Sequence, residues 1–255
     1  MKRLGLNHGR YHGEGLNVAE YLREFHLAAQ TRGWRPEHFA SVHGYELHGY
    51  RRGPTNPART IYISTGIHGD EPAGPVALRR LVEEDRWPRD AALILCPCVN
   101  PSGLQAKTRE NIAGVDLNRD YRGPQSAEVR AHVAWLDTLP ALDLSLILHE
   151  DWESDGYYLY EVNYDALPSP GLKIIEAVRE FCPIQPTSII DETWECENGI
   201  IRPNIKPEDR PLWAEAVYLI VNKTRLSLTL EAPSDFPLPF RAAAHVRAVY
   251  AGLGM

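Results

Sequence analysis

The stretch STGIHGDEPAG, residues 64–74, places a histidine and two acids directly after an apolar run. His68 and Glu71 are three residues apart, and Pro72 suits the first turn of a following helix. Imidazole nitrogen and carboxylate oxygen are both good zinc ligands. Taken alone, so short a pair indicates a polar turn more often than a metal site. The remaining ligands of a metal site must therefore come from elsewhere in the chain.

The elements that would position such a site alternate along the chain. Apolar runs typical of strands are separated by amphipathic segments of ten or more residues, which indicates crossover connections. We therefore predict an α/β fold, with a mixed, largely parallel twisted β-sheet and helices on both faces. The expected strands are 60–66, 91–99, 142–150 and 226–233, with 156–162 as a strand or a loop, and 38–53 as an edge hairpin. The expected helices are 16–33, 75–85, 126–139, 170–182, 211–222 and 237–253.

Composition limits the class of protein. The chain has 255 residues and a net charge of -7, which fits one large domain and argues against nucleic acid or an anionic membrane as partner. No run approaches the ~20 apolar residues of a membrane span, and the N-terminus lacks a secretory pattern. The four cysteines are expected to be reduced packing residues of a cytoplasmic protein.

Ionisable residues follow four of the expected strands. These residues are His68 with Glu71, the segment 100–121, His149 and Glu231. Open α/β sheets bind ligands at the carboxyl ends of their strands, so we expect these groups to meet. Two histidines and one glutamate would leave a tetrahedral zinc one open position, as in catalytic sites. The other eight histidines are expected to be surface or packing residues.

Four blocks, in order, resemble the zinc carboxypeptidases of the carboxypeptidase A type. They are HGDE (68–71), KTRENIAGVDLNRDY (107–121), LILHE (146–150) and LTLEAP (228–233). The resemblance implies a single zinc ion bound by His68, Glu71 and His149, with Glu231 as the general base. It also implies one catalytic domain over 1–255, with an N-terminal helix and edge hairpin in 1–58 and the catalytic core in 59–255.

In the middle block, the resemblance implies roles for four further residues. Arg109 would polarise the scissile carbonyl, because a fixed guanidinium stabilises an oxyanion. Asn118 and Arg119 would hold the terminal carboxylate of the substrate by planar hydrogen bonding. Asp116 would orient His68 from the side away from the metal.

The blocks also depart from the pancreatic-type enzymes. No tyrosine stands at the family's distance before Glu231, so a tyrosine contact with substrate is not predicted. Pro-Ala-Gly after HGDE looks more like the branch of bacterial murein tripeptide amidases and of succinylglutamate desuccinylase and aspartoacylase. We therefore predict a zinc carboxypeptidase acting on short, murein-type peptides. The alternative is an N-acyl-amino-acid deacylase, and a catalytically dead zinc-binding protein is disfavoured because Glu231 and Arg109 are both present.

Two further segments stay open at this point. The acidic and aromatic stretch 191–204 could line the substrate cleft, with Arg202 as a candidate to bind a second substrate carboxylate, although a solvated loop is favoured. Glu150, Asp151 and Glu153 stand beside a proposed zinc ligand and could bind a cationic group or a second metal. The single-zinc interpretation is preferred.

Overall fold

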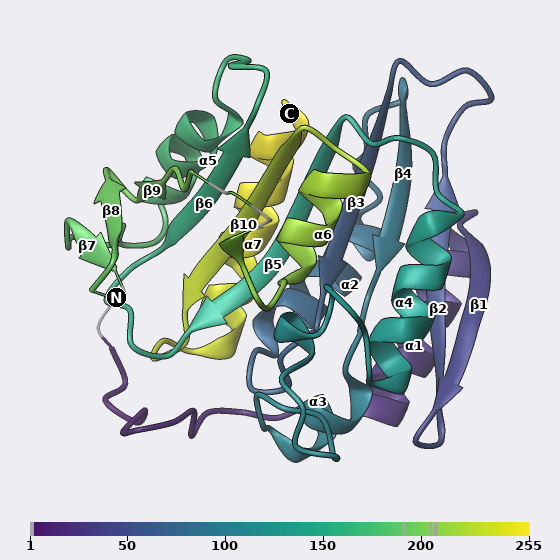
Figure 1. The fold of residues 1–255 in the computed structure, drawn as a ribbon, viewed down its shortest axis with the longest axis horizontal. Coiled ribbons are helices and arrows are strands. Elements are labelled where there is room, and N and C mark those ends of the chain that lie inside the picture. The colour runs from purple at the N-terminus through teal and green to yellow at the C-terminus, as the bar shows by residue number, and fades with distance from the viewer. Residues whose placement is uncertain (1–2, 191, 205, 207–208) are drawn as a thin grey trace.

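The protein is built around one ten-stranded sheet, in the order β1-β2-β4-β3-β5-β10-β6-β9-β8-β7 (Figure 1). The computed structural model describes residues 3–190, 192–204, 206 and 209–255, so Asp191 of the stretch 191–204 lies outside the described residues. The strands are β1 (Arg35–Val42), β2 (Tyr45–Arg52), β3 (Arg59–Thr65), β4 (Ala91–Cys96), β5 (Leu144–Asp151), β6 (Tyr158–Asn163), β7 (Ile189–Ile190), β8 (Trp194–Glu197), β9 (Ile200–Ile201) and β10 (Leu226–Pro233).

The sheet is mixed, and the prediction that it is largely parallel was wrong. Its centre, β4-β3-β5-β10, pairs in parallel, but five of the nine pairings between described strands are antiparallel. On the flanks, β1–β2, β7–β8 and β8–β9 are antiparallel hairpins, whereas β6 and β9 pair in parallel. In the β1–β2 hairpin, His43 and Gly44 both have positive φ, which fits the right-handed twist of the two strands.

Helices cover both faces of the sheet, as predicted (Figure 1). One face packs against α1, α2, α5 and α7 in the larger apolar core, and the other packs against α4 and α6 in a second core. The helices are α1 (Val18–Thr31), α2 (Ala73–Glu84), α3 (Pro101–Ala106), the 3₁₀ turn η1 (Leu117–Arg119), α4 (Ala127–Asp137), α5 (Pro170–Arg179), α6 (Glu215–Asn222) and α7 (Leu238–Leu253). No described helix is both long and apolar enough to cross a membrane.

Alternation along β5 and β10 decides which residues face the α6 side. Leu148 and Leu230 belong to the core on the α7 side. Successive side chains of a strand point to opposite faces, so their neighbours His149 and Glu231 point to the α6 side. The two strands run in parallel, with Glu231 directly opposite His149. The sheet register therefore makes these two residues neighbours.

The loop between β3 and α2 is seated closely on α3. Asn100 donates through Nδ2 to the Ile67 carbonyl at 3.1 Å and accepts from the Gly103 N–H at 2.9 Å. A Cβ at Gly69 would lie 1.9 Å from the Gly103 carbonyl carbon, so only glycine fits there. The position of His68 thus depends on a contact between two glycines.

The contact between Gly69 and Gly103 leads to a prediction about stability. Gly69→Ala should lower the free energy of unfolding by about 1–3 kcal/mol, because the added methyl forces backbone apart in a packed region. Urea denaturation monitored by circular dichroism measures the change. Gly123→Ala is the matched control, since nothing lies within 4 Å of the added Cβ. Equal stability of the two variants would contradict the close packing of the loop.

Candidate metal centre

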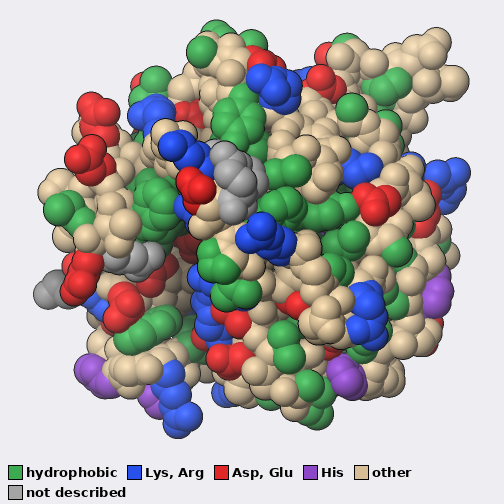
Figure 2. Space-filling model, in the orientation of Figure 1, with side chains coloured by type: hydrophobic (Ala, Val, Ile, Leu, Met, Phe, Trp, Pro, Cys, Tyr) green, Lys and Arg blue, Asp and Glu red, His purple; other side chains and the backbone are tan. Residues whose placement is uncertain are grey.

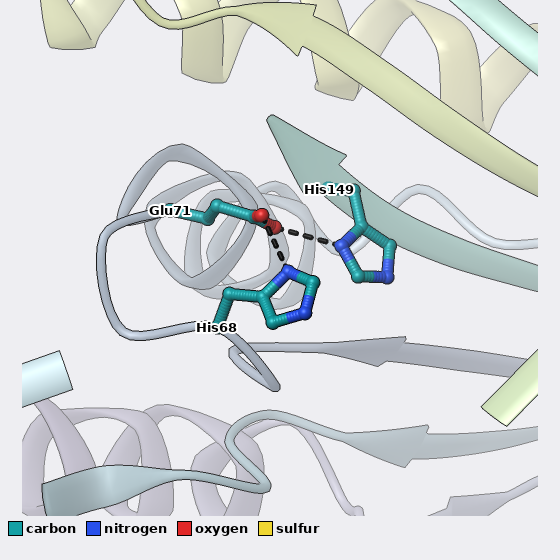
Figure 3. Close-up of side chains that lie close together, drawn as sticks. All are labelled: His68, Glu71 and His149. Carbon is teal, nitrogen blue, oxygen red and sulfur yellow. Dashed lines mark hydrogen bonds and ion pairs between the residues drawn. The ribbon is translucent and has the colours of Figure 1, made fainter. Parts of the chain in front are cut away.

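Three predicted residues converge at the carboxyl ends of β3 and β5 (Figure 3). His68 Nδ1 lies 2.6 Å from Glu71 Oε1, and His149 Nδ1 lies 2.8 Å from Glu71 Oε2. All three side chains are buried, and one possible ligand atom from each lies within 4.8 Å of the others. Among the described residues, this is the one group of three or more His, Cys, Asp or Glu that meets this condition.

The arrangement fits a metal ion. Tetrahedral zinc with bonds of about 2.0–2.1 Å needs donor atoms roughly 3.3 Å apart, which small shifts of these three side chains would give. The Nε2 atom of His68 is buried and has no hydrogen-bond partner among the described residues, although it lies 3.4 Å from Asp116 Oδ1. If Nδ1 bound a metal, Nε2 would carry the proton and face that carboxylate, as the outer partner of a metal-bound histidine does.

Two members of the triad, His68 and Glu71, have shifted pKa values. Burial lowers the pKa of His68, but the charge of Glu71 and the contact with Asp116 outweigh it and raise the pKa to about 9. Burial also opposes ionisation of Glu71, yet the two histidines hold its pKa well below the usual range. A carboxylate that stays ionised at this depth is suited to a cation.

Asp116 connects His68 to Arg109. Its Oδ2 accepts a hydrogen bond from Arg109 Nε at 2.9 Å, and its Oδ1 accepts the Asn118 N–H at 2.9 Å. Burial raises the pKa of Asp116, but His68 and Arg109 together hold it well below its usual range. Arg109 Nη1 lies 3.5 Å from His68 Nδ1, so its positive charge stands beside the triad.

Glu231 is the acid beside the triad that the sequence proposes as a base. Burial raises the pKa of Glu231 to about 8; His149 opposes this shift, and the charge of Glu71 adds to it. Asp70, to which the sequence assigns no role, also faces this pocket. Its Oδ1 is buried without a hydrogen-bond partner among the described residues, and burial with the charge of Glu71 raises its pKa to about 6.

A cavity of about 420 Å³ opens in front of these groups. Its lining includes seven of the eight predicted site residues: His68, Glu71, Arg109, Asn118, Arg119, His149 and Glu231. On the face of the molecule drawn in Figure 2, acidic and basic side chains lie close together. The eighth residue, Asp116, stands behind His68.

Asn118 and Arg119 reach the cavity from η1 in different ways. Asn118 is buried, and its Oδ1 accepts the Glu215 N–H at the start of α6. This hydrogen bond fixes the amide and leaves its Nδ2 for another acceptor. Arg119 is exposed, and its Nη1 donates to the Asn118 carbonyl at 2.8 Å. Among the described residues, no carboxylate forms an ion pair with Arg119.

The sequence suggests the stretch 191–204 for the remaining cavity wall, and Trp194 and Pro203 of that stretch do line it. Tyr158 and Tyr160 on β6, Trp194 on β8 and Arg210 line it. Arg210 lies over the Trp194 ring at 5.5 Å. The period-2 alternation of GYYLYEV is the sequence signal for the β6 part of this wall, since it places every second residue of the strand on one face.

Two further sequence candidates have other partners. Arg202 donates through Nε to Glu161 Oε2 at 3.1 Å, so it does not serve as the second carboxylate ligand considered above. Glu150 forms an ion pair with the buried Arg241, which argues against its use in a second metal site. The single-metal interpretation is the one that the triad fits.

Comparison with known families bears on the fold and the class of protein. Residues 57–160 match the sequence model of the succinylglutamate desuccinylase/aspartoacylase catalytic domain. The predicted family resemblance is confirmed. The match to this catalytic domain supports an enzyme of the hydrolase class, as the sequence predicts. The matched segment contains the triad but ends before Glu231. No curated protein matches the sequence.

Solved structures share the fold at low identity. A candidate metallopeptidase of Shewanella denitrificans OS217 superposes with a TM-score of 0.82 at 21% identity, covering 93% of this chain and 90% of that one. The metallo-carboxypeptidase of Burkholderia cenocepacia has a TM-score of 0.71 at 20% identity, over 94% and 69% of the two chains. A Pseudomonas aeruginosa metallo-carboxypeptidase, in complex with (2-guanidinoethylmercapto)succinic acid, has a TM-score of 0.68 at 18% identity, over 94% and 69%.

The contact between Asp116 and His68 yields a prediction for metal binding. Asp116→Asn should weaken zinc affinity about 10–100-fold, because the carboxylate that favours the Nε2-protonated tautomer of His68 is removed. Competition against a chromophoric chelator measures this affinity. Asp120→Asn is the control, since Asp120 instead accepts hydrogen bonds from Gln125 and Ser126. Zinc affinity within threefold of wild type for Asp116→Asn would rule out the orienting role.

Proposed function

We propose that the chain is a zinc-dependent carboxypeptidase that hydrolyses the C-terminal amide bond of short peptides. The observation that carries this proposal is the shared cavity: a His-Glu-His triad, the acid Glu231 and the polar pair Asn118 and Arg119 face one space. His68, Glu71 and His149 would hold the metal. The chemistry supplied by zinc at such a site is Lewis acidity toward a carbonyl oxygen and the activation of a water molecule.

Glu231 is proposed as the general base. It stands opposite His149 in the register of β5 and β10, and it lines the cavity. Its carboxylate would accept a proton from the attacking water and return it to the leaving nitrogen. A dication nearby would favour the ionised form of Glu231 and counter the effect of burial.

Three side chains are proposed to bind the substrate. Arg109, held by Asp116 through Nε, would donate from its remaining N–H groups to the carbonyl oxygen as negative charge develops there. Arg119 and the Nδ2 of Asn118 would hold the terminal carboxylate. Charge-assisted hydrogen bonds of this kind are stronger than neutral ones, and they fix the scissile bond in position.

The alternative substrate class is an N-acyl amino acid, and the match of residues 57–160 to the succinylglutamate desuccinylase/aspartoacylase domain favours it. Both classes present a free carboxylate to the same residues. We place the peptide first because the cavity continues from the triad along β6 to Tyr160, Val162 and Leu212, which is more space than a small acyl group requires.

Replacing the proposed base tests the mechanism. Glu231→Gln should lower kcat about 10²–10⁴-fold, since a group that transfers protons is lost, while bound zinc stays stoichiometric. Steady-state kinetics and metal analysis on the same preparation provide both values. Glu161→Gln, on the neighbouring strand and outside the cavity lining, should retain activity. A Glu231→Gln rate within twofold of wild type would show that another group is the base.

A substrate panel tests the choice between peptide and acyl amino acid. We expect cleavage of short peptides with a free C-terminus. C-terminal amidation should lower kcat/KM at least about tenfold, because Arg119 then loses its charged partner. Mass spectrometry of the products identifies the bond that is cleaved. Turnover of acetyl- or succinyl-amino acids without peptide cleavage would overturn the first choice and establish the deacylase.

A further inference from the structure

Glu150 follows the proposed metal ligand His149 on β5 and points to the opposite face of the sheet. Its side chain is fully buried. Its Oε1 accepts the Ala73 N–H at 2.5 Å, and its Oε2 accepts a hydrogen bond from Arg241 Nη1. Ala73 is the first residue of α2 and comes two residues after Glu71. One carboxylate therefore joins the two chain segments that supply the triad.

Helix α7 holds this part of β5 from behind. Arg241 and His245 are one turn apart on the helix, so they lie on the same side of it. His245 donates through Nε2 to the His149 carbonyl at 3.0 Å, and Arg241 pairs with Glu150. Two consecutive residues of the strand are thus fixed by two consecutive turns of the helix.

On its other side, Arg241 binds the segment that precedes α1. Its Nη2 donates to the Tyr11 hydroxyl at 3.0 Å and to Glu14 Oε2 at 2.9 Å. Its Nε donates to the Phe236 carbonyl at 2.7 Å. The guanidinium has no exposed surface and is satisfied on every side, so Glu150 is held by a fixed partner rather than a mobile one.

We propose that Glu150, supported by Arg241, is a positioning residue that sets the distance between His149 and Glu71 and so pre-organises the metal triad. This inference rests on the proposed function, which assigns these residues as metal ligands. Glu150 does not touch the metal position itself. It acts by holding β5 and the first turn of α2 in one geometry, because ligand atoms bind a metal tightly only when their separation is already close to that of the complex.

The chain contains a matched control in Glu161. This buried acid on β6 pairs with Arg202 and accepts the Gly171 N–H at the start of α5 at 3.3 Å. Like Glu150, Glu161 is buried, pairs with an arginine and accepts a hydrogen bond from an N–H at the start of a helix. Glu161 lies outside the triad, so its replacement reports how much stability is lost with such a pair when metal binding is not affected.

Three variants test the inference by zinc affinity, measured on metal-free protein by chelator competition, together with the thermal midpoint of the metal-free form. They are Glu150→Gln, Glu161→Gln and the double variant Glu150→Leu with Arg241→Met. The double variant removes both charges, so it leaves no unpaired buried ion and should fold even where the single variant does not.

We expect zinc affinity to fall about 10–100-fold for Glu150→Gln and for the double variant, the range found for outer partners of metal ligands. Glu161→Gln should lower the thermal midpoint but leave zinc affinity within threefold of wild type. The inference is overturned if a folded Glu150 variant binds zinc within threefold of wild type, or if Glu161→Gln weakens zinc as much. Because no substrate is used, a wild-type protein that binds zinc but cleaves neither substrate class would contradict the proposed function alone.

Discussion

The sharing of one buried carboxylate between two imidazoles is the interaction on which the rest of the site depends. An ionised group at this depth is costly unless it is paired and hydrogen-bonded, and Glu71 meets that requirement through His68 and His149. The second ring nitrogen of His68 then needs an acid, which Asp116 provides, and Asp116 in turn holds Arg109. His68, Asp116 and Arg109 thus form a chain of contacts that starts from this one charge.

The sheet supplies the geometry that makes such sharing possible. Parallel pairing brings the carboxyl ends of β3, β5 and β10 to one edge, and the β5–β10 register makes His149 and Glu231 neighbours. Because strand side chains alternate, neighbouring residues of β5 point to opposite faces of the sheet. His149 faces the cavity and Glu150 faces α7, so one strand end presents a metal ligand on one side and is anchored on the other.

How much of the site the sequence predicts depends on how far apart the interacting residues are along the chain. His68, Glu71, His149 and Glu231 were found because each directly follows an apolar run, which is a local pattern. The pairing of Glu150 with Arg241 joins residues 91 positions apart and leaves no local pattern, so it could not be predicted.

The same reasoning explains the error in the sheet. Alternating strand and helix patterns indicate parallel pairing correctly for β4-β3-β5-β10. On the flanks, β1 and β2 follow each other without a helix, and β7 and β9 have only two residues each. The antiparallel pairs β2–β4 and β10–β6 join strands that are separated by helices in the chain, so packing rather than connection decides their direction. The start of α6 at Glu215 rather than near residue 211 also follows from a distant contact, the hydrogen bond from its N–H to Asn118.

The family match covers only part of the chain that lines the cavity. The match to the known catalytic domain spans residues 57–160, which contain the triad, Arg109 and the carboxylate-binding pair. The cavity wall beyond it comes from β8, from the segment around Arg210 and from α6, all C-terminal to that match. Because these elements and Glu231 lie outside the matched segment, the match over residues 57–160 does not determine the substrate. The choice between peptide and acyl amino acid therefore depends on the cavity wall that includes Trp194 and Arg210, where Arg210 lies over the Trp194 ring. None of the proposed metal ligands belongs to this wall.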